Sequence, residues 1–217
     1  MPAVLLRALV PPVCRALPWR ALAVAGALGL LLAASTRLPD RPPSPETGLA
    51  VLRIVALLGA LGLAFLLDDP ARRTTTGVPV RRPVRAGLRL ALVAPLAAGW
   101  WTAALFLIPA PSRPPAAHLS LEALALAACA LALPAIAIRF TTEAEPGRAT
   151  AFWLGIATAA TGLVPDKWGL FVAEGTQQWG PAHVRWAVLL GVAAVVWAIC
   201  LPEPLRRRSV HLSPSGV

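Results

Sequence analysis

Long apolar stretches alternate with short polar segments along the whole chain. A helix that crosses the roughly 30 Å hydrocarbon core of a bilayer needs roughly 20 mainly apolar residues. The stretches that come near this length are residues 21–36, 48–67, 88–109, 120–138, 150–164 and 184–201. The fifth of them is short and carries glycine and threonine. The pattern therefore predicts an all-α, polytopic membrane protein with about six transmembrane helices, in a domain that covers residues 21–201.

The segments on either side of this domain have a different character. Residues 1–20 mix apolar residues and a few arginines with Pro11, Pro12 and Pro18, which favours a segment in the membrane interface over a spanning helix. A frayed terminus is one alternative. Another is a cleaved signal peptide, with an apolar core from residue 21 and AAS as the cleavage site, which would leave five helices. Residues 202–217 form a basic tail.

Basic residues are unevenly distributed between alternate loops. If the N-terminus lies in the cytoplasm, the inner segments hold Arg7, Arg15, Arg20, Arg72, Arg73, Arg81, Arg82, Arg85, Arg139, Arg148, Arg206, Arg207 and Arg208. The outer loops hold only Arg37, Arg41, Arg113 and Lys167. Cytoplasmic loops of membrane proteins are enriched in Arg and Lys, so this bias predicts that both termini are cytoplasmic. It also accounts for the net charge of +10, and we expect no nucleic-acid partner.

Composition agrees with a membrane protein, and the residue types present argue against several kinds of disulfide, metal and catalytic site. Hydrophobic residues make up 57% of the chain and charged residues 14%. Lys167 is the one lysine and tyrosine is absent, a bias typical of GC-rich bacterial genes, so we expect a bacterial cell membrane. Cys14, Cys129 and Cys200 are isolated, which gives no disulfide framework and no metal spacing. No Walker A, HExxH or GxSxG motif occurs, so we expect neither an enzyme nor a cofactor.

The stretch LLDDPARRTTTGVPVRRPVRAGL, residues 66–88, concentrates charge between two expected spans. Asp68 and Asp69 could hold Mg²⁺ for diphosphate chemistry, but that requires a second acidic cluster. The other inner loop offers only Glu143 and Glu145. The simpler interpretation is that the two acids end a helix and are neutralised by nearby arginines. The arginines would also attract anionic lipid headgroups, at about 1 kcal/mol per charge, and the run could dock a soluble partner.

Three charged residues fall inside expected spans, at similar depth near their outer ends. They are Arg53, Glu122 and Arg185. Intramembrane charges are costly and often functional. Glu122 could pair with either arginine in an outer polar vestibule, with His118 and His183 close by. The alternative is that each charge extends separately to the headgroups.

The outer loop between the fifth and sixth spans, residues 165–183, is unusually apolar. It contains Trp168, Phe171 and Trp179, and it is too short to span the membrane. Tryptophan is enriched at membrane–water interfaces. We therefore expect an interfacial or re-entrant hairpin anchored by the two tryptophans.

Taken together, these features resemble an ABC-2-type transporter permease. The shared layout is six spans with both ends inside, an N-terminal interfacial segment, a basic loop after the second span and an apolar outer hairpin after the fifth. In addition, LLDDPARRTTTGVPVRRPVRAGLRLAL, residues 66–92, is similar to a DDPA…T…P…R…R pattern of small ABC transporter components from GC-rich bacteria. The resemblance covers most of the chain.

The resemblance implies a permease subunit of an exporter that works with a separate ATPase chain. The ATPase would contact Asp68, Asp69, Arg72, Arg73, Arg81 and Arg82. The outer gate would include Trp168, Phe171 and Trp179. Two permease copies, as a homodimer or a pair, would move a hydrophobic or amphipathic substrate, with membrane lipid as the remaining partner. The alternatives are an accessory membrane protein without transport activity and an intramembrane Mg-dependent transferase that uses the two aspartates.

Overall fold

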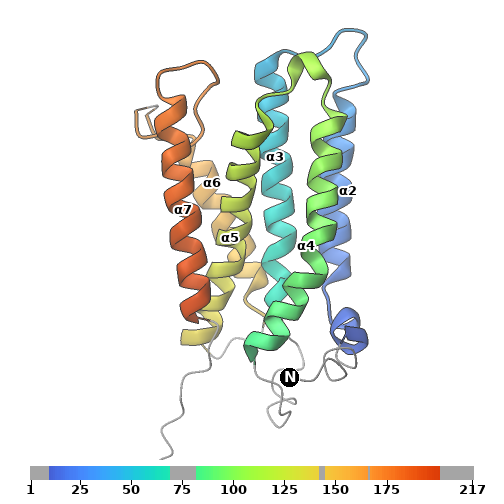
Figure 1. Ribbon diagram of the computed structural model, residues 1–217, viewed down its shortest axis with the longest axis vertical. Helices are drawn as coiled ribbons and strands as arrows, with labels where there is room; N and C mark the ends of the chain where they lie inside the picture. Colours follow the sequence, from blue (N-terminus) through green and yellow to red (C-terminus); the bar gives the residue numbers. More distant parts are fainter. Residues whose placement is uncertain (1–9, 69–81, 142–144, 166, 201–217) are drawn as a thin grey trace, which may run out of the picture.

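The computed structural model describes residues 10–68, 82–141, 145–165 and 167–200, and over these residues the protein is helical, without strands. Six long helices stand side by side (Figure 1). They are α2 (Trp19–Ser35), α3 (Pro45–Leu63), α4 (Arg82–Leu107), α5 (Ala116–Phe140), α6 (Gly147–Thr161) and α7 (Trp179–Cys200). Two 3₁₀ turns, η1 (Ala64–Leu67) and η3 (Ala110–Ser112), follow α3 and α4. All six apolar stretches of the sequence therefore lie in helices.

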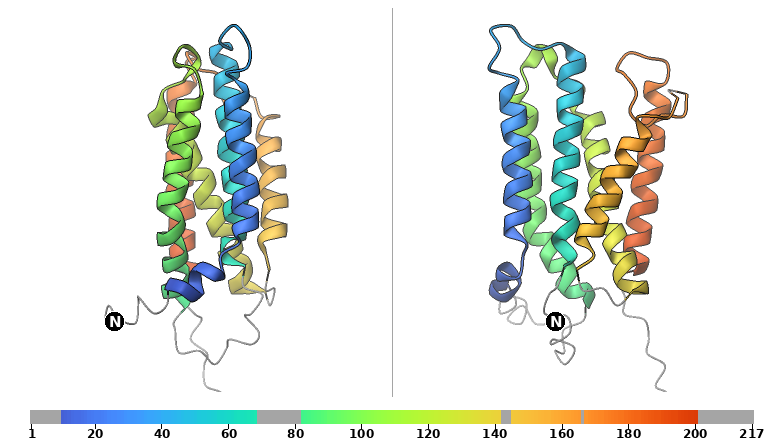
Figure 2. Two further views of the ribbon diagram at one scale, coloured as in Figure 1. Left: turned by 90° about the vertical axis from the view of Figure 1, so that its right-hand side faces the viewer. Right: turned by 180° about the vertical axis from the view of Figure 1, so that it is seen from behind.

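The helices run alternately up and down in Figure 1, with α3 and α5 in the middle of the bundle. α2 and α4 pack beside α3, and α7 and α6 pack beside α5. We call the end of the bundle at which α2 begins and α3 and α5 end the lower end, and the opposite end the upper end (Figure 1). A short helix at residues 10–15 lies at the lower end, across the bundle (Figure 2).

Four helices are long and apolar enough to cross a membrane: Pro45–Leu67, Pro83–Leu107, Ala116–Phe140 and Trp179–Cys200. α2 is apolar but has 17 residues, and α6 has 15. Large apolar side chains also lie exposed along the sides of the bundle, for example Val188, Val192 and Val195 on α7. Rows of exposed apolar side chains are stable where they face lipid hydrocarbon and unfavourable where they face water. Length, composition and surface are thus those of a membrane protein.

Local sequence signals explain where α3 begins and ends. Pro45 occupies the first helical position, and the Ser44 hydroxyl accepts a hydrogen bond from the Thr47 amide (3.2 Å). After Leu63 the helix tightens into η1, and Asp68 leaves it with extended backbone. Arg89 of α4 then donates from Nη1 to the carbonyls of Leu66 (3.1 Å) and Asp68 (3.0 Å), which stabilises this lower end of the hairpin.

Small residues bring α2, α3 and α4 close together in the middle of the bundle. The indole of Trp100 on α4 lies against Gly26, Gly29 and Gly59, and its Nε1 donates to the Gly26 carbonyl (2.9 Å). A Cβ at Gly29 would lie 2.5 Å from the ring, and one at Gly59 would lie 2.8 Å from it. Close approach through small residues is typical of helices that pack inside a membrane.

Candidate functional site

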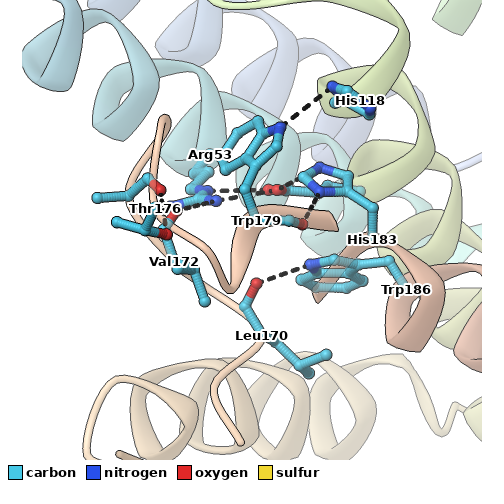
Figure 3. Close-up of polar contacts among 10 residues, drawn as sticks. Arg53, His118, Leu170, Val172, Thr176, Trp179, His183 and Trp186 are labelled. Carbon is cyan, nitrogen blue, oxygen red and sulfur yellow. Dashed lines mark hydrogen bonds and ion pairs between the residues drawn. The ribbon is translucent and has the colours of Figure 1, made fainter. Parts of the chain in front are cut away.

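A buried ion pair joins the two central helices near the upper end. Arg53 of α3 donates from Nε to Glu122 Oε2 and from Nη2 to Glu122 Oε1, both at 2.9 Å (Figure 3). The Arg53 side chain is 15% exposed and that of Glu122 only 1%. A two-pronged contact of this kind fixes both side chains and satisfies both carboxylate oxygens. The expected alternative, in which Glu122 reaches separately to the headgroups, does not apply.

The loop between α6 and α7 closes over this pair. Arg53 Nη2 also donates to the carbonyl of Val172 (3.0 Å), and Val172 itself is 2% exposed. The guanidinium lies over the ring of Phe171, 5.2 Å from its centroid, and 5.9 Å from that of Trp179. Cations over aromatic faces are attracted by the ring quadrupole, more strongly where water is excluded. The loop therefore covers the cation from its outer side.

Two histidines complete the cluster on the other side of Glu122. His183 Nε2 lies 3.4 Å from Glu122 Oε1, and His183 Nδ1 lies 2.8 Å from the carbonyl oxygen of Trp179. Trp179 Nε1 donates to His118 Nδ1 (3.3 Å), and the two imidazole rings are 4.3 Å apart between centroids. Figure 3 shows these side chains converging from α3, α5 and α7. We call Arg53, Glu122, His118, His183 and Trp179 the upper cluster.

Arg185 belongs to the loop contacts and does not join the ion pair. Its Nη1 donates to the Gly169 carbonyl (2.7 Å) and its Nη2 to the Lys167 carbonyl (2.6 Å). One residue further, Trp186 donates from Nε1 to the Leu170 carbonyl (2.9 Å) and stacks against Phe171 at 5.3 Å. Successive residues of α7 therefore bind successive parts of the loop.

The structure brings together most of the residues that the sequence placed at the outer end. Arg53 and Glu122 pair, with His118 and His183 beside them, while Arg185 binds the loop that covers them. Of the three aromatic residues of the expected hairpin, Phe171 and Trp179 are half-buried in contact with Arg53. Trp168 is 69% exposed. From residue 167 to residue 178 the segment consists of turns, bends and irregular backbone, and its interfacial or re-entrant position stays a prediction.

Two residues that hold the site together, Val172 and Trp186, were not predicted from the sequence. The Val172 carbonyl has no signature in the sequence, since every residue carries one. Trp186 is 1% exposed and holds the loop through its indole N–H. A tryptophan inside a span usually finds a partner for its N–H, and Trp186 follows Trp179 by two helical turns. That spacing was the available signal.

Of the six predicted docking residues, the structure describes two, Asp68 and Arg82, and both lie at the lower end. Asp68 Oδ1 accepts a hydrogen bond from the Gly147 amide (2.8 Å), so this carboxylate caps the N-terminus of α6. A Cβ at Gly147 would lie 2.5 Å from Asp68 Oδ2, so the cap requires glycine there. Arg82 is the first residue of α4. The remaining predicted contacts, Asp69, Arg72, Arg73 and Arg81, fall outside the described residues.

Of the four acids considered for a metal site between the spans, the structure describes Asp68 and Glu145. One oxygen of Asp68 already accepts from a backbone amide, and Glu145 is exposed. Glu143 and Asp69 fall outside the described residues. Within the part of the chain that the structure describes, no group of three or more His, Cys, Asp or Glu residues could hold a metal ion. The three cysteines are free.

Comparison with known proteins yields no match to a family model, to a curated protein or to a solved structure. The resemblance to an ABC-2-type permease therefore stays a prediction that depends on the layout of the chain and on residues 66–92.

Proposed function

We propose that the chain is a multi-pass protein of a bacterial cell membrane and acts as the permease subunit of an ABC-type exporter. All six helices cross the membrane in this proposal, with the lower end and both termini in the cytoplasm. The observation that carries the proposal is the Arg53–Glu122 pair, buried near the upper end and closed by the loop after α6. Buried charges at one membrane face are expensive, and a closable polar constriction is one function that requires them.

A mechanical connection between the two ends supports the proposal. The basic segment that would dock the ATPase follows Asp68 directly, and Asp68 holds the first turn of α6. α6 continues at its upper end into the loop that closes over Arg53. A movement of the docking segment would therefore reach the upper loop through one rigid helix. In this mechanism the partner ATPase supplies the energy, and the chain itself carries no catalytic residue or cofactor.

The apolar surface favours a hydrophobic or amphipathic substrate. Exposed Val184, Val188, Val192 and Ile199 run along one face of α7, and α4 exposes Leu96 and Phe106. A polar solute would find few partners on these walls, since hydrocarbon-like surfaces satisfy no hydrogen bonds. A second copy of the chain would supply the opposite wall of the pathway, as the permease resemblance implies.

Co-purification with a candidate ATPase tests the docking step. Arg72, Arg73, Arg81 and Arg82 are all changed to glutamate, and we expect the complex to be lost because the contact surface changes sign. The matched control reverses Arg41 and Lys167, which lie in loops at the upper end. An unaffected complex after the fourfold change would remove the coupling idea.

Orientation is tested by labelling single cysteines in intact cells, after replacement of Cys14, Cys129 and Cys200. We expect a membrane-impermeant reagent to label Glu174→Cys, because Glu174 is exposed in the upper loop. Gly77→Cys, in the basic segment, should react only after the cells are permeabilised. Labelling of Gly77→Cys from outside would invert the orientation and exclude docking from the cytoplasm.

An accessory membrane protein without transport activity is the second candidate. Close packing favours it: Trp100 fills the space between three glycines, and both charges of the ion pair have partners inside the fold. Transport of an amphipathic dye into vesicles that contain the chain and its ATPase separates the two functions. The permease proposal expects transport that Phe171→Ala alters without loss of the complex. The accessory function expects no transport from either protein.

A further inference from the structure

The hydrogen bonds of His183 determine which of its nitrogens carries a proton. Nδ1 lies 2.8 Å from the carbonyl oxygen of Trp179. A carbonyl oxygen only accepts hydrogen bonds, so Nδ1 must be the donor and must carry a hydrogen. In a neutral imidazole the other nitrogen then carries none and presents a lone pair. For His183 that nitrogen is Nε2.

Nε2 faces a carboxylate oxygen in a buried place. It lies 3.4 Å from Glu122 Oε1, and it is a buried nitrogen without a hydrogen-bond partner. If Glu122 is ionised and His183 neutral, two acceptors face each other with little water between them, which buried polar groups avoid. One additional proton removes the conflict. It makes His183 an imidazolium or makes Glu122 a carboxylic acid that donates to Nε2.

We propose that Glu122 and His183 together form a proton-binding site that holds one proton when the upper loop is closed. The proton forms an N–H bond at Nε2 or an O–H bond at Oε1, two atoms that lie 3.4 Å apart. It raises the total charge of Arg53, Glu122 and His183 from zero to +1. The site depends on the geometry of the upper cluster alone, and it goes beyond the proposed export function.

Charged and titratable groups face the site from α3, α5, α7 and the loop. From α3, Arg53 faces Glu122 and holds both of its oxygens, which keeps the carboxylate in position but also opposes a second cation. From α5, His118 faces His183 across 4.3 Å. From α7, Arg185 is directed to the carbonyls of Lys167 and Gly169. Lys167 and Glu174 of the loop are exposed.

His118 provides access from the upper surface. His118 is half-buried, whereas His183 is 6% and Glu122 0% exposed. His118 Nδ1 accepts from Trp179 Nε1, which directs its other nitrogen away from that bond. A proton that reaches His118 from the outer medium is therefore on the ring next to His183, with 4.3 Å between the two ring centroids. Trp179 contacts both rings, at 5.6 and 4.4 Å between centroids, and fixes this arrangement.

The bound proton couples the loop to the outer pH. The closed loop holds one proton more than a form in which His183 faces water as a neutral ring. A state that binds more protons is favoured as pH falls. Closure is therefore favoured as pH falls and weakened as pH rises.

Nitrogen NMR of ¹⁵N-histidine in the full chain, held in lipid nanodiscs near neutral pH, tests the site directly. His118→Asn and His211→Asn variants assign the three histidines, and infrared spectroscopy reports whether a buried carboxyl is protonated. We expect either a doubly protonated His183 ring or a protonated Glu122. A neutral His183 with bare Nε2 beside an ionised Glu122 would falsify the proposal. The ATPase takes no part, so failure here is distinct from failure of the export function.

Two variants, Glu122→Gln and its control Glu46→Gln, test the site by the same NMR measurement. In Glu122→Gln the amide can donate to Nε2 directly, so the additional proton should be lost and His183 should become neutral. Glu46→Gln, at an exposed acid on the first turn of α3, should leave the spectrum unchanged. If Glu122→Gln does not fold, the wild-type spectrum and its pH titration still decide the matter. The protection factors of residues 169–173, which remove the intrinsic pH dependence of amide exchange, should rise by several-fold between pH 8 and pH 6.5, and unchanged protection factors would exclude the coupling to the loop.

Discussion

Charged side chains join helices at both ends of the bundle, but they meet different partners. At the upper end, Arg53 and Glu122 bind each other, and both are removed from solvent. At the lower end, Asp68 binds the Gly147 amide, and Arg89 binds the carbonyls of Leu66 and Asp68. The upper contact is between charges, whereas these lower contacts are between a charge and the backbone.

The difference has energetic consequences. A buried ion pair contributes little net stability, yet removal of one partner leaves the other charge stranded at a cost of about 3–5 kcal/mol. A carboxylate at a helix N-terminus contributes about 1 kcal/mol, and water can replace it. We therefore expect the upper end to be sensitive to single substitutions and tolerant of paired ones. Loss of the Asp68 contact with the Gly147 amide should have a smaller effect.

Glu122→Gln is expected to have the largest effect. It removes the only carboxylate that binds Arg53 among the described residues and lowers the free energy of unfolding by about 3 kcal/mol. Equilibrium unfolding in mixed micelles measures this value. Glu46→Gln, at an exposed position, is the control and should change it by less than about 0.5 kcal/mol. Equal values for the two variants would mean that the pair carries no energetic weight.

The double variant Arg53→Met, Glu122→Leu removes both charges of the pair, whereas Glu122→Gln removes only one. Both charges are absent, so no charge of the pair is stranded, and we expect at least half of the lost stability to return. The measurement is again equilibrium unfolding, compared with Glu122→Gln. A double variant that is less stable than the single one would show that the loop contacts of Arg53, to Val172 and Phe171, outweigh the ion pair.

Phe171→Ala should have an intermediate effect. Phe171 is half-buried between Arg53 and Trp186, so truncation is expected to cost about 2 kcal/mol, less than for a fully buried phenylalanine. Trp168→Ala is the matched control in the same loop, and because Trp168 is 69% exposed its cost should stay below about 0.5 kcal/mol. Limited proteolysis of the loop gives a second readout. Similar cleavage of both variants would mean that Phe171 does not hold the loop.

The sequence predicted the helices better than their ends. Each apolar stretch is helical, but α4 begins at Arg82 and α7 at Trp179, five or more residues before the apolar runs at 88 and 184. Hydropathy detects the part of a helix that hydrocarbon can solvate, whereas the helix itself continues into polar residues as long as its backbone hydrogen bonds persist. Pro83, near the start of α4, is compatible with this because the first turn requires no amide donors.

The sequence predicted how deep the charged residues of the upper cluster lie along their helices, but not which arginine pairs with Glu122. Counting along the spans placed Arg53, Glu122 and Arg185 at one level. The choice of Arg53 over Arg185 as the partner of Glu122 depends on how α3 and α7 are rotated about their axes beside α5. Helix rotation follows from the whole packed core, including the glycines around Trp100. Backbone partners such as the Val172 carbonyl are invisible in any sequence.

At the lower end, the sequence suggested that Asp68 ends a helix, and the structure adds a partner 79 residues away. Asp68→Ala removes the cap of α6 and should cost about 1 kcal/mol. Asp68→Asn keeps an oxygen that can accept from Gly147 and should cost less than half as much. Hydrogen exchange of the first turn of α6, residues 147–150, is the measurement. Identical protection in Asp68→Ala and in the wild type would mean that the cap is unimportant.

Arg185→Gln is expected to have the smallest effect, and it decides how general the contrast between the ends is. Arg185 lies at the upper end, yet it binds backbone, the carbonyls of Lys167 and Gly169, as Asp68 binds the Gly147 amide. If the type of partner determines the energy, its loss should cost about 0.5–1 kcal/mol, since water can hydrate both carbonyls in the half-exposed loop. If position determines the energy, the cost should approach that of Glu122→Gln. Unfolding of the two variants under one condition separates these causes, and a small value for Arg185→Gln assigns the sensitivity of the upper end to the buried pair itself.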